Sequence, residues 1–313
     1  MASLVARFGW NVFWLGRYME RAEALARILD INETYARDKP EGPDWLRVLD
    51  LYADTERFDE NHEVADAATV SNFYVIDRDN PTSVAASIAG ARQNARSVRH
   101  LISTEMWTHL NMFHNKISQL NQRDIRLNNL SRVCAEIKLD CQTFEGVAEG
   151  TFFRGEAWCF YQLGKYLERA DQTTRILDMG FDRISDTDTD GRDSIHWSVL
   201  LRSVAGYHAF RSLYPAGSSA RDIAGFLLYD QEFPRAVALC VERISTRLHE
   251  LEMRHQHQRH PKVEEARRSL AFTLETGLGQ RVTPARLHKF IDDLQIALGN
   301  VSAEIGESYL LSG

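Results

Sequence analysis

Two segments of the chain carry glutamate and arginine side chains at matching positions. They are LGRYMERAEALARILD (residues 15–30) and LGKYLERADQTTRILD (residues 163–178), so the offset is 163 − 15 = 148 residues. Carboxylates spaced in this way could act as general bases or hold a divalent metal, and arginines could bind an anion. The residues that carry this chemistry are Arg17, Tyr18, Glu20, Arg21, Glu23 and Arg27 in the first segment, and Lys165, Tyr166, Glu168, Arg169, Asp171 and Arg175 in the second.

The charged positions recur more faithfully than several apolar ones. On a helix with about 100° per residue, Glu20, Glu23 and Arg27 lie on one side and an apolar arc lies on the other. Within that arc Gln162 of the second segment replaces Trp14 of the first, whereas each of the charges has a counterpart. Packing normally preserves an apolar face and leaves a solvated face free to drift. The charged face therefore indicates partners more specific than water.

Like charges within the motif also indicate partners elsewhere in the fold. Glu20 and Glu23 lie one turn apart, and so do Arg17 and Arg21, which is unfavourable on an isolated helix. A facing helix would relieve this, because arginine matches a carboxylate with two parallel hydrogen bonds. We therefore expect the two motif helices to lie close together about an approximate two-fold axis, with their charges paired in the interior.

A structural ion-pair network is the favoured interpretation of these charges, because buried charges are tolerated when they are paired. The alternative is a binding site for an anionic or peptide-like group. A dinuclear metal centre could use the four carboxylates, but the adjacent arginines would compete for them and repel a cation. The sequence therefore predicts no metal ion and no cofactor.

The motifs resemble the paired signature of the alpha-E family, which consists of bacterial all-helical proteins named for a Glu-Arg motif. Trp10 and Trp158 lie at the same distance before the two motifs, and residues 77–107, 196–214 and 226–244 agree as well. The family has no established activity. Its members are encoded beside, or fused to, a circularly permuted ATP-grasp ligase, a transglutaminase-like cysteine peptidase and sometimes an N-terminal-nucleophile hydrolase. The resemblance implies a role in making or processing peptides, with these proteins as partners.

Composition excludes several classes of protein. The 313 residues are 44% apolar and 26% charged, which is enough for a large core, and the net charge of −7 argues against general binding of nucleic acid. No apolar run approaches a membrane span, and Arg7 and Arg17 interrupt the N-terminal stretch that a signal peptide would need. We expect a cytoplasmic protein without membrane contact. Four cysteines make no disulfide framework and are predicted to be small core residues: Cys134, Cys141, Cys159 and Cys240.

Helical periodicity dominates the chain, and no segment alternates with a period of two for long enough to predict a strand. Short polar breaks lie at residues 37–44, 119–124, 183–194, 215–220, 254–261 and 277–284. Pro81 and Pro234 each precede an apolar-periodic run, which predicts that they occupy the first helical turn. The repeat predicts an all-α fold of two duplicated helical halves, residues 1–150 and 151–313, packed as one bundle-like body with pseudo-two-fold symmetry.

An acidic segment, Asp186 to Gly191, copies the opening of a calcium-binding loop. Its twelfth position is Trp197, where such a loop needs a bidentate glutamate. A solvated linker is therefore the favoured interpretation.

A histidine cluster is the other candidate metal site: it comprises His249, Glu252, His255, His257 and His260. The spacing of Glu252 and His255 is that of di-iron helical bundles, but no second Glu-x-x-His occurs in the chain. Interleaved arginines favour a basic helix end before Pro261.

Two functions from different classes follow. The favoured one is a non-catalytic helical partner or scaffold of an ATP-grasp-linked peptide synthesis or processing system, since the sequence has no Gly-x-Ser-x-Gly nucleophile motif and no phosphate-binding glycine loop. The alternative is an enzyme with an acid/base site at the pseudo-two-fold axis. That site would use Glu20, Arg21, Glu168 and Arg169, with Tyr18 and Tyr166 as donors.

Overall fold

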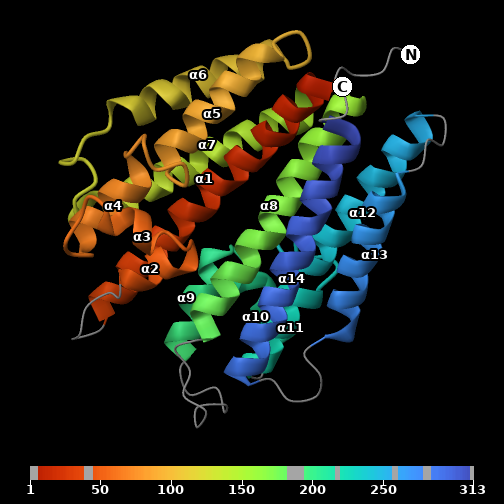
Figure 1. Ribbon diagram of the computed structural model, residues 1–313. Helices are drawn as coiled ribbons and strands as arrows, with labels where there is room; N and C mark the ends of the chain where they lie inside the picture. Colours follow the sequence, from red (N-terminus) through yellow and green to blue (C-terminus); the bar gives the residue numbers. More distant parts are fainter. Residues whose placement is uncertain are drawn as a thin grey trace. The chain divides into compact units, whose positions relative to one another are not determined.

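The computed structural model describes residues 6–38, 45–181, 194–215, 219–255, 260–277 and 283–310 (Figure 1). All regular elements in these ranges are helical, which confirms the prediction of an all-α fold. They are α1 (Ala6–Asp38), α2 (Leu46–Leu51), α3 (Thr55–Asp59), α4 (Ala67–Val75), α5 (Val84–Ser97), α6 (Thr104–Gln119), α7 (Leu127–Thr151), α8 (Glu156–Phe181), α9 (Ser194–Ser203), α10 (Tyr207–Leu213), α11 (Ala220–Tyr229), α12 (Val237–Arg254), α13 (Pro261–Thr276), α14 (Pro284–Ile305) and a π-helical turn, η1 (Gly306–Leu310).

The chain divides into two compact units. The N-terminal unit is Trp14–Phe153, and the C-terminal unit is Arg154–Gly313 together with Met1–Phe13. Helix α1 therefore begins in the C-terminal unit and continues through the N-terminal unit without a break. Each unit is described by itself below.

Four long helices, α1, α5, α6 and α7, form the body of the N-terminal unit. Helix α6 packs against α5 and α7, and α4 adds contacts to α5 and α7. A stripe of residues spaced three or four apart lets α7 bury one face: Leu130, Val133, Ile137, Cys141, Phe144 and Ala148. Helix α1 approaches α5 closely, because a Cβ on Gly90 would lie only 2.8 Å from Cε2 of Tyr18.

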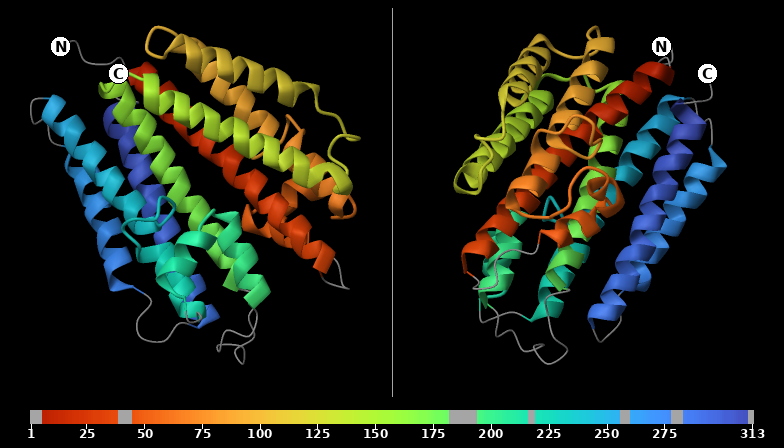
Figure 2. Two further views of the ribbon diagram at one scale, coloured as in Figure 1. Left: turned by 180° about the vertical axis from the view of Figure 1, so that it is seen from behind. Right: turned by 60° about the vertical axis from the view of Figure 1, so that its left-hand side comes forward.

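Four other long helices, α8, α12, α13 and α14, form the body of the C-terminal unit and run beside one another (Figure 2). Helix α8 packs mainly against α12 and α14, and α13 packs mainly against α14. Every residue of α8 from Ala157 to Lys165 is buried. Helix α8, which carries the second motif, is thus the most enclosed helix of its unit.

The two prolines do not begin helices as predicted. Pro81 lies in the turn before Ser83, whose side chain caps α5, and Pro234 lies in the turn before Ala236, the N-cap of α12. The turns are longer than the sequence indicated, because side chains such as Asn80 hold the backbone ahead of the helix. Other prolines, at the starts of α13 and α14, do occupy the first turn.

All four cysteines are buried and form no disulfide, as predicted. Burial, and then the adjacent carboxylate of Glu250, raises the pKa of Cys159 to about 12. Burial also raises the pKa of Cys134, which lies near Asp30. These thiols are therefore protonated core side chains rather than nucleophiles.

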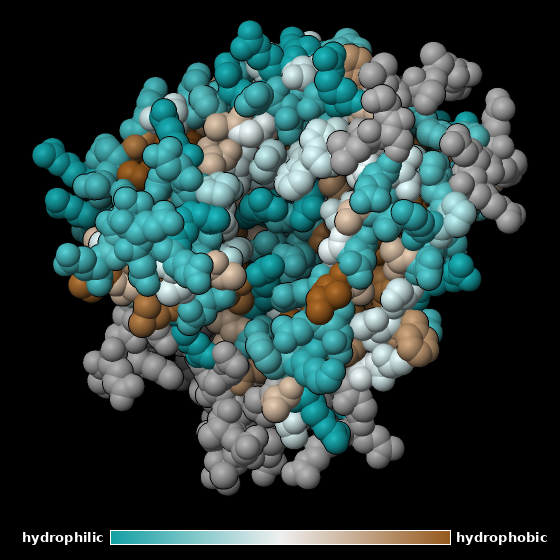
Figure 3. Space-filling model, viewed as in Figure 1, coloured by the Kyte–Doolittle hydropathy of each residue, from teal (hydrophilic) through white to brown (hydrophobic). Residues whose placement is uncertain are grey.

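The surface drawn in Figure 3 is mainly hydrophilic, with hydrophobic residues in small groups. The large apolar side chains with high exposure include Phe153, Phe272, Met112 and Ile296. None of the described helices is long and apolar enough to cross a bilayer. The acidic segment Asp186 to Gly191 and the histidine His257 fall outside the described residues.

Candidate functional site

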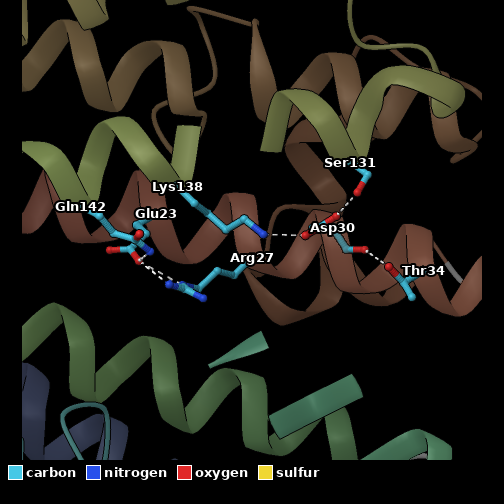
Figure 4. A network of polar contacts seen from close by, with 7 residues as sticks. All are labelled: Glu23, Arg27, Asp30, Thr34, Ser131, Lys138 and Gln142. Atoms are coloured by element: carbon cyan, nitrogen blue, oxygen red, sulfur yellow. Dashed lines mark hydrogen bonds and ion pairs between the residues drawn. The ribbon is translucent and has the colours of Figure 1, made fainter. Parts of the chain in front are cut away.

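The first motif forms a buried ion pair on α1 (Figure 4). Oε1 of Glu23 accepts hydrogen bonds from Nε and Nη2 of Arg27 at 3.1 and 2.6 Å. Nε2 of Gln142, on α7, donates to the same oxygen at 3.2 Å. The side chains of Glu23 and Arg27 are each only 7% exposed. The charge of this carboxylate is thus compensated inside the protein, as a buried charge requires.

The polar stripe of α1 continues to Asp30, where α7 supplies both partners. Nζ of Lys138 lies 2.6 Å from Oδ2 of Asp30, and Oγ of Ser131 donates to Oδ1 at 2.6 Å. The carbonyl oxygen of Asp30 accepts from Oγ1 of Thr34 at 2.8 Å. Figure 4 shows this row of side chains between α1 and α7. Charge-assisted hydrogen bonds therefore fix the register of the two helices.

The remaining charges of the first motif lie against aromatic rings and α7. The guanidinium of Arg17 is 4.8 Å from the ring centroid of Trp14, and that of Arg21 is 5.9 Å from the centroid of Tyr18. Glu20 is 4% exposed, and its charge, after burial and Glu23, raises the pKa of Cys141. Glu20 and Glu23 therefore lie near Cys141 of α7, and the two arginines lie near aromatic rings of α1.

The second motif, on α8, forms the equivalent pair with more exposure. Nε of Arg175 lies 2.8 Å from Oδ2 of Asp171, with side chains 25% and 20% exposed. Glu168 is 1% exposed, and its Oε1 accepts from Nε2 of Gln172 at 3.3 Å. In each unit a glutamine thus donates a hydrogen bond to a buried glutamate of the motif. Gln142 of α7 donates to Glu23, and Gln172 of the motif helix itself donates to Glu168.

Cationic side chains of the second motif surround Tyr166. Nζ of Lys165 is 4.6 Å from the ring centroid of Tyr166, and the guanidinium of Arg169 is 5.8 Å from it. Nη1 of Arg169 donates to the carbonyl oxygen of Pro234 at 3.4 Å. The arginine therefore ties α8 to the turn before α12.

The structure brings the predicted residues of each motif together within their own unit. Glu23 with Arg27, and Asp171 with Arg175, are paired along one helix at a spacing of four residues. The meeting of Glu20 and Glu168 at a two-fold axis stays a prediction, because these residues belong to different units.

Sequence reasoning missed the partners on α7. Ser131, Lys138 and Gln142 lie seven and four residues apart, so they share one face of that helix. This polar face borders the apolar stripe of α7. The row of polar residues beside the apolar row was the feature of the sequence that could have indicated a polar contact with another helix.

The histidine cluster is spread over two helix ends. The ring of His255, the C-cap of α12, pairs with Glu156, and the ring of His260 lies tilted against that of Tyr309, with the two centroids 4.0 Å apart. In the described part of the chain no three His, Cys, Asp or Glu side chains gather as a metal site would require. Basic side chains at the end of α12 contact the protein itself, since Arg254 donates to the carbonyl oxygen of Arg154 at 2.8 Å.

Relatives of the chain are uncharacterized proteins of Mycobacterium bovis and Mycobacterium tuberculosis. Each is 23% identical over 261 residues. The match covers 77% of this chain but only 29% of each relative, so the chain spans less than a third of their length. No solved structure matches the chain.

The model of one protein family covers nearly the whole chain. It matches residues 4–310 and describes Alpha-E as a predicted alpha-helical domain with a conserved ER motif. The Glu-Arg pairs of the motif helices, Glu20 with Arg21 and Glu168 with Arg169, fit that description, as does the all-helical fold. The chain therefore belongs to the Alpha-E family.

Proposed function

We propose that this chain is a non-catalytic helical partner, or scaffold, of an ATP-grasp-linked peptide synthesis or processing system in the bacterial cytoplasm. The observation that carries the proposal is the state of the motif carboxylates. Glu23 accepts three hydrogen bonds from Arg27 and Gln142, and Asp171 is held by Arg175. Carboxylates held in this way stabilise a scaffold, whereas a general base needs a lone pair within reach of a substrate.

The organisation of the relatives supports a role alongside other proteins. In the mycobacterial relatives the matched region makes up 29% of a longer chain. In these relatives the helical region is thus joined to further polypeptide, as expected of a module that works together with other domains. The resemblance to the alpha-E family names the partners: a circularly permuted ATP-grasp protein and a transglutaminase-like peptidase.

A binding and turnover experiment tests this proposal. The purified chain is mixed with a circularly permuted ATP-grasp protein, the partner that the proposal names, association is measured by calorimetry, and ATP hydrolysis is followed with amino acids present. We expect a complex that buries about 800 Å² on each partner and a changed rate of ATP turnover. No heat of binding at protein concentrations that detect Kd values of about 10 µM, with turnover unchanged, would contradict the proposal.

The same preparation separates the scaffold from the enzyme alternative. A scaffold alone should neither ligate nor hydrolyse peptides, and Glu20→Gln and Glu168→Gln should affect only folding and partner binding. Glu265→Gln, an exposed site on α13, is the matched control. Peptide turnover by the chain alone that these two motif variants abolish, at unchanged melting temperature, would establish the enzyme instead.

A further inference from the structure

A pocket of about 830 Å³ opens in the C-terminal unit between α12, α13 and η1. Leu248 and Val263, both buried, line it from the two helices. Its volume is in the range of about 300–1,000 Å³ that is typical of sites for small ligands. The polar side chains around this apolar centre are divided by charge between the two ends.

One end of the pocket is acidic and aromatic. The rings of His260 and Tyr309 lie there tilted against each other, with centroids 4.0 Å apart, and the charge of Glu252 acts on the phenol. Burial and the charge of Glu252 raise the pKa of Tyr309 to about 12, so the phenol is neutral and can donate a hydrogen bond. A carboxylate beside aromatic rings is the chemistry that binds an ammonium group.

A buried nitrogen at this end lacks a partner among the residues that the structure describes. Nε2 of His260 is inaccessible to solvent and forms no hydrogen bond with any of them. Burial, and then the nearby His255, lowers the pKa of His260, so the ring is neutral at neutral pH and one of its nitrogens is an acceptor. Buried polar atoms are nearly always satisfied, and this one lacks a donor such as a ligand N–H.

The other end of the pocket is basic. Arg267 pairs with Glu264 at 2.6 Å, and Nε of Arg268 lies 3.5 Å from the same carboxylate. Two guanidinium groups around one carboxylate leave an excess of one positive charge. Nη1 of Arg267 also lies 3.5 Å from Oγ of Ser245, which places this end beside Ser245 on α12.

The separation of the two ends sets the size of the ligand. Ser245 and Glu252 are seven residues apart on α12, which corresponds to about 10 Å along the helix axis. An extended peptide spans about 3.3–3.6 Å per residue, so about three residues bridge this distance. We propose that the pocket binds a short peptide with free termini, its ammonium group at Glu252, His260 and Tyr309 and its carboxylate at Arg268.

This inference goes beyond the scaffold role and rests on the pocket alone. It is tested by titrating the full chain with trialanine, N-acetyl-trialanine, trialanine amide and alanine in a calorimeter. Trialanine should bind, and blocking either terminus should weaken binding by about 10-fold or more, because each block removes a charge-assisted hydrogen bond. Alanine should bind more weakly than trialanine, because it is too short to reach both ends.

Variants locate the site. Glu252→Gln should remove the discrimination against N-acetyl-trialanine, and Arg268→Gln should remove the discrimination against trialanine amide. Glu265→Gln and Arg243→Gln, both exposed and outside the pocket, are the matched controls and should bind trialanine as the unmodified chain does.

Three results would overturn the inference: no heat with trialanine at millimolar concentration, equal affinity for free and blocked peptides, or unaltered discrimination in both pocket variants. Peptide binding without association with an ATP-grasp protein would refute the scaffold proposal and leave the pocket standing. The reverse result would refute only the pocket.

Discussion

The helix pair α5–α6 of the N-terminal unit is closed, whereas the pair α12–α13 of the C-terminal unit is open. Helices α5 and α6 pack extensively on each other, while α12 packs mainly on α8 and α13 mainly on α14. The seventh residue of α6 is Leu110, which is completely buried, and the seventh residue of α13 is Arg267. The charged side chain of Arg267 thus interrupts the apolar stripe of α13, and at this place α12 and α13 enclose a pocket instead of packed apolar side chains.

Residues at the edge of each pair strengthen the contrast. In the N-terminal unit Trp107 lies between two guanidinium groups, with Arg92 at 5.6 Å and Arg99 at 4.8 Å from its ring centroid. The predicted repeat, with an offset of 234 − 81 = 153 residues, places Ser245 and Glu252 at the positions of these arginines. The shorter side chains of Ser245 and Glu252 leave space between α12 and α13, whereas Arg92 and Arg99 occupy the corresponding space beside Trp107.

The motif helices follow the same trend. The pair of Glu23 and Arg27 is 7% exposed on both sides, whereas Asp171 and Arg175 are 20% and 25% exposed. The ion pair of Glu23 and Arg27 is therefore the more enclosed of the two, and the expected effects of mutating the two arginines differ accordingly.

The largest difference is expected at the motif arginines. Arg27→Ala leaves the buried carboxylate of Glu23 without its main partner and should lower the free energy of unfolding by about 3–5 kcal/mol. Arg175→Ala should lower it by about 0–1 kcal/mol, because water reaches that pair. Urea denaturation measures both, and Arg132→Ala, in an exposed pair with Glu136, is the control. Equal losses for Arg27 and Arg175 would break the comparison.

A second difference concerns the helix pairs. Leu110→Ala removes a fully buried side chain and should lower the free energy of unfolding by about 2–5 kcal/mol. Arg267→Ala, at the corresponding position, should cost about 0–1 kcal/mol, because its partner Glu264 is 49% exposed. Thermal denaturation of the two variants decides the matter, and a larger loss for Arg267→Ala would show that α12–α13 is not the open pair.

A smaller effect is expected where α1 meets α5. Gly90→Ala would place a Cβ 2.8 Å from the ring of Tyr18 and should cost about 1–3 kcal/mol through overpacking. In Gly146→Ala on α7 the added Cβ would meet no neighbouring atom within 4 Å, so this variant should instead stabilise the helix by about 0.5–1 kcal/mol. Stabilisation by both variants, measured by urea denaturation, would show that α1 and α5 can separate at little cost.

The smallest effect is a pH dependence of the open pair. The pKa of His260 lies below its ordinary value of 6.5, so the unfolded chain takes up the proton first as the pH falls. The contribution of neutral His260 to the free energy of unfolding is therefore complete above pH 6.5. It decreases as the pH falls from 6.5 to the pKa of His260 in the folded protein. A charged His260 would also repel the ammonium group of a peptide. Trialanine affinity should therefore be constant above about pH 6.5 and fall as the pH drops below it, and His260→Gln should flatten that dependence.

Periodicity and composition were enough to predict the helical fold and the C-terminal ends of α12 and α13. The pairing of Glu23 with Arg27 was also within reach, because a spacing of four residues places both on one helical face. The contribution of Gln142 was missed, because the polar row on α7 indicates that this face has polar partners but does not indicate which helix supplies them. The pocket was not predicted either, because its lining comes from α12, α13 and η1 and becomes apparent only when these elements are packed together.

The continuity of α1 has a consequence for cutting the chain. Gly306 of η1 lies against Trp10, with the ring 3.5 Å from where a Cβ would be, and both residues belong to the C-terminal unit. A cleavage between Phe153 and Arg154 therefore does not release the C-terminal unit whole, because its first helical turns stay on the other fragment. The C-terminal fragment would need the start of α1 from the other fragment to complete its unit, which makes the two fragments a system for fragment complementation.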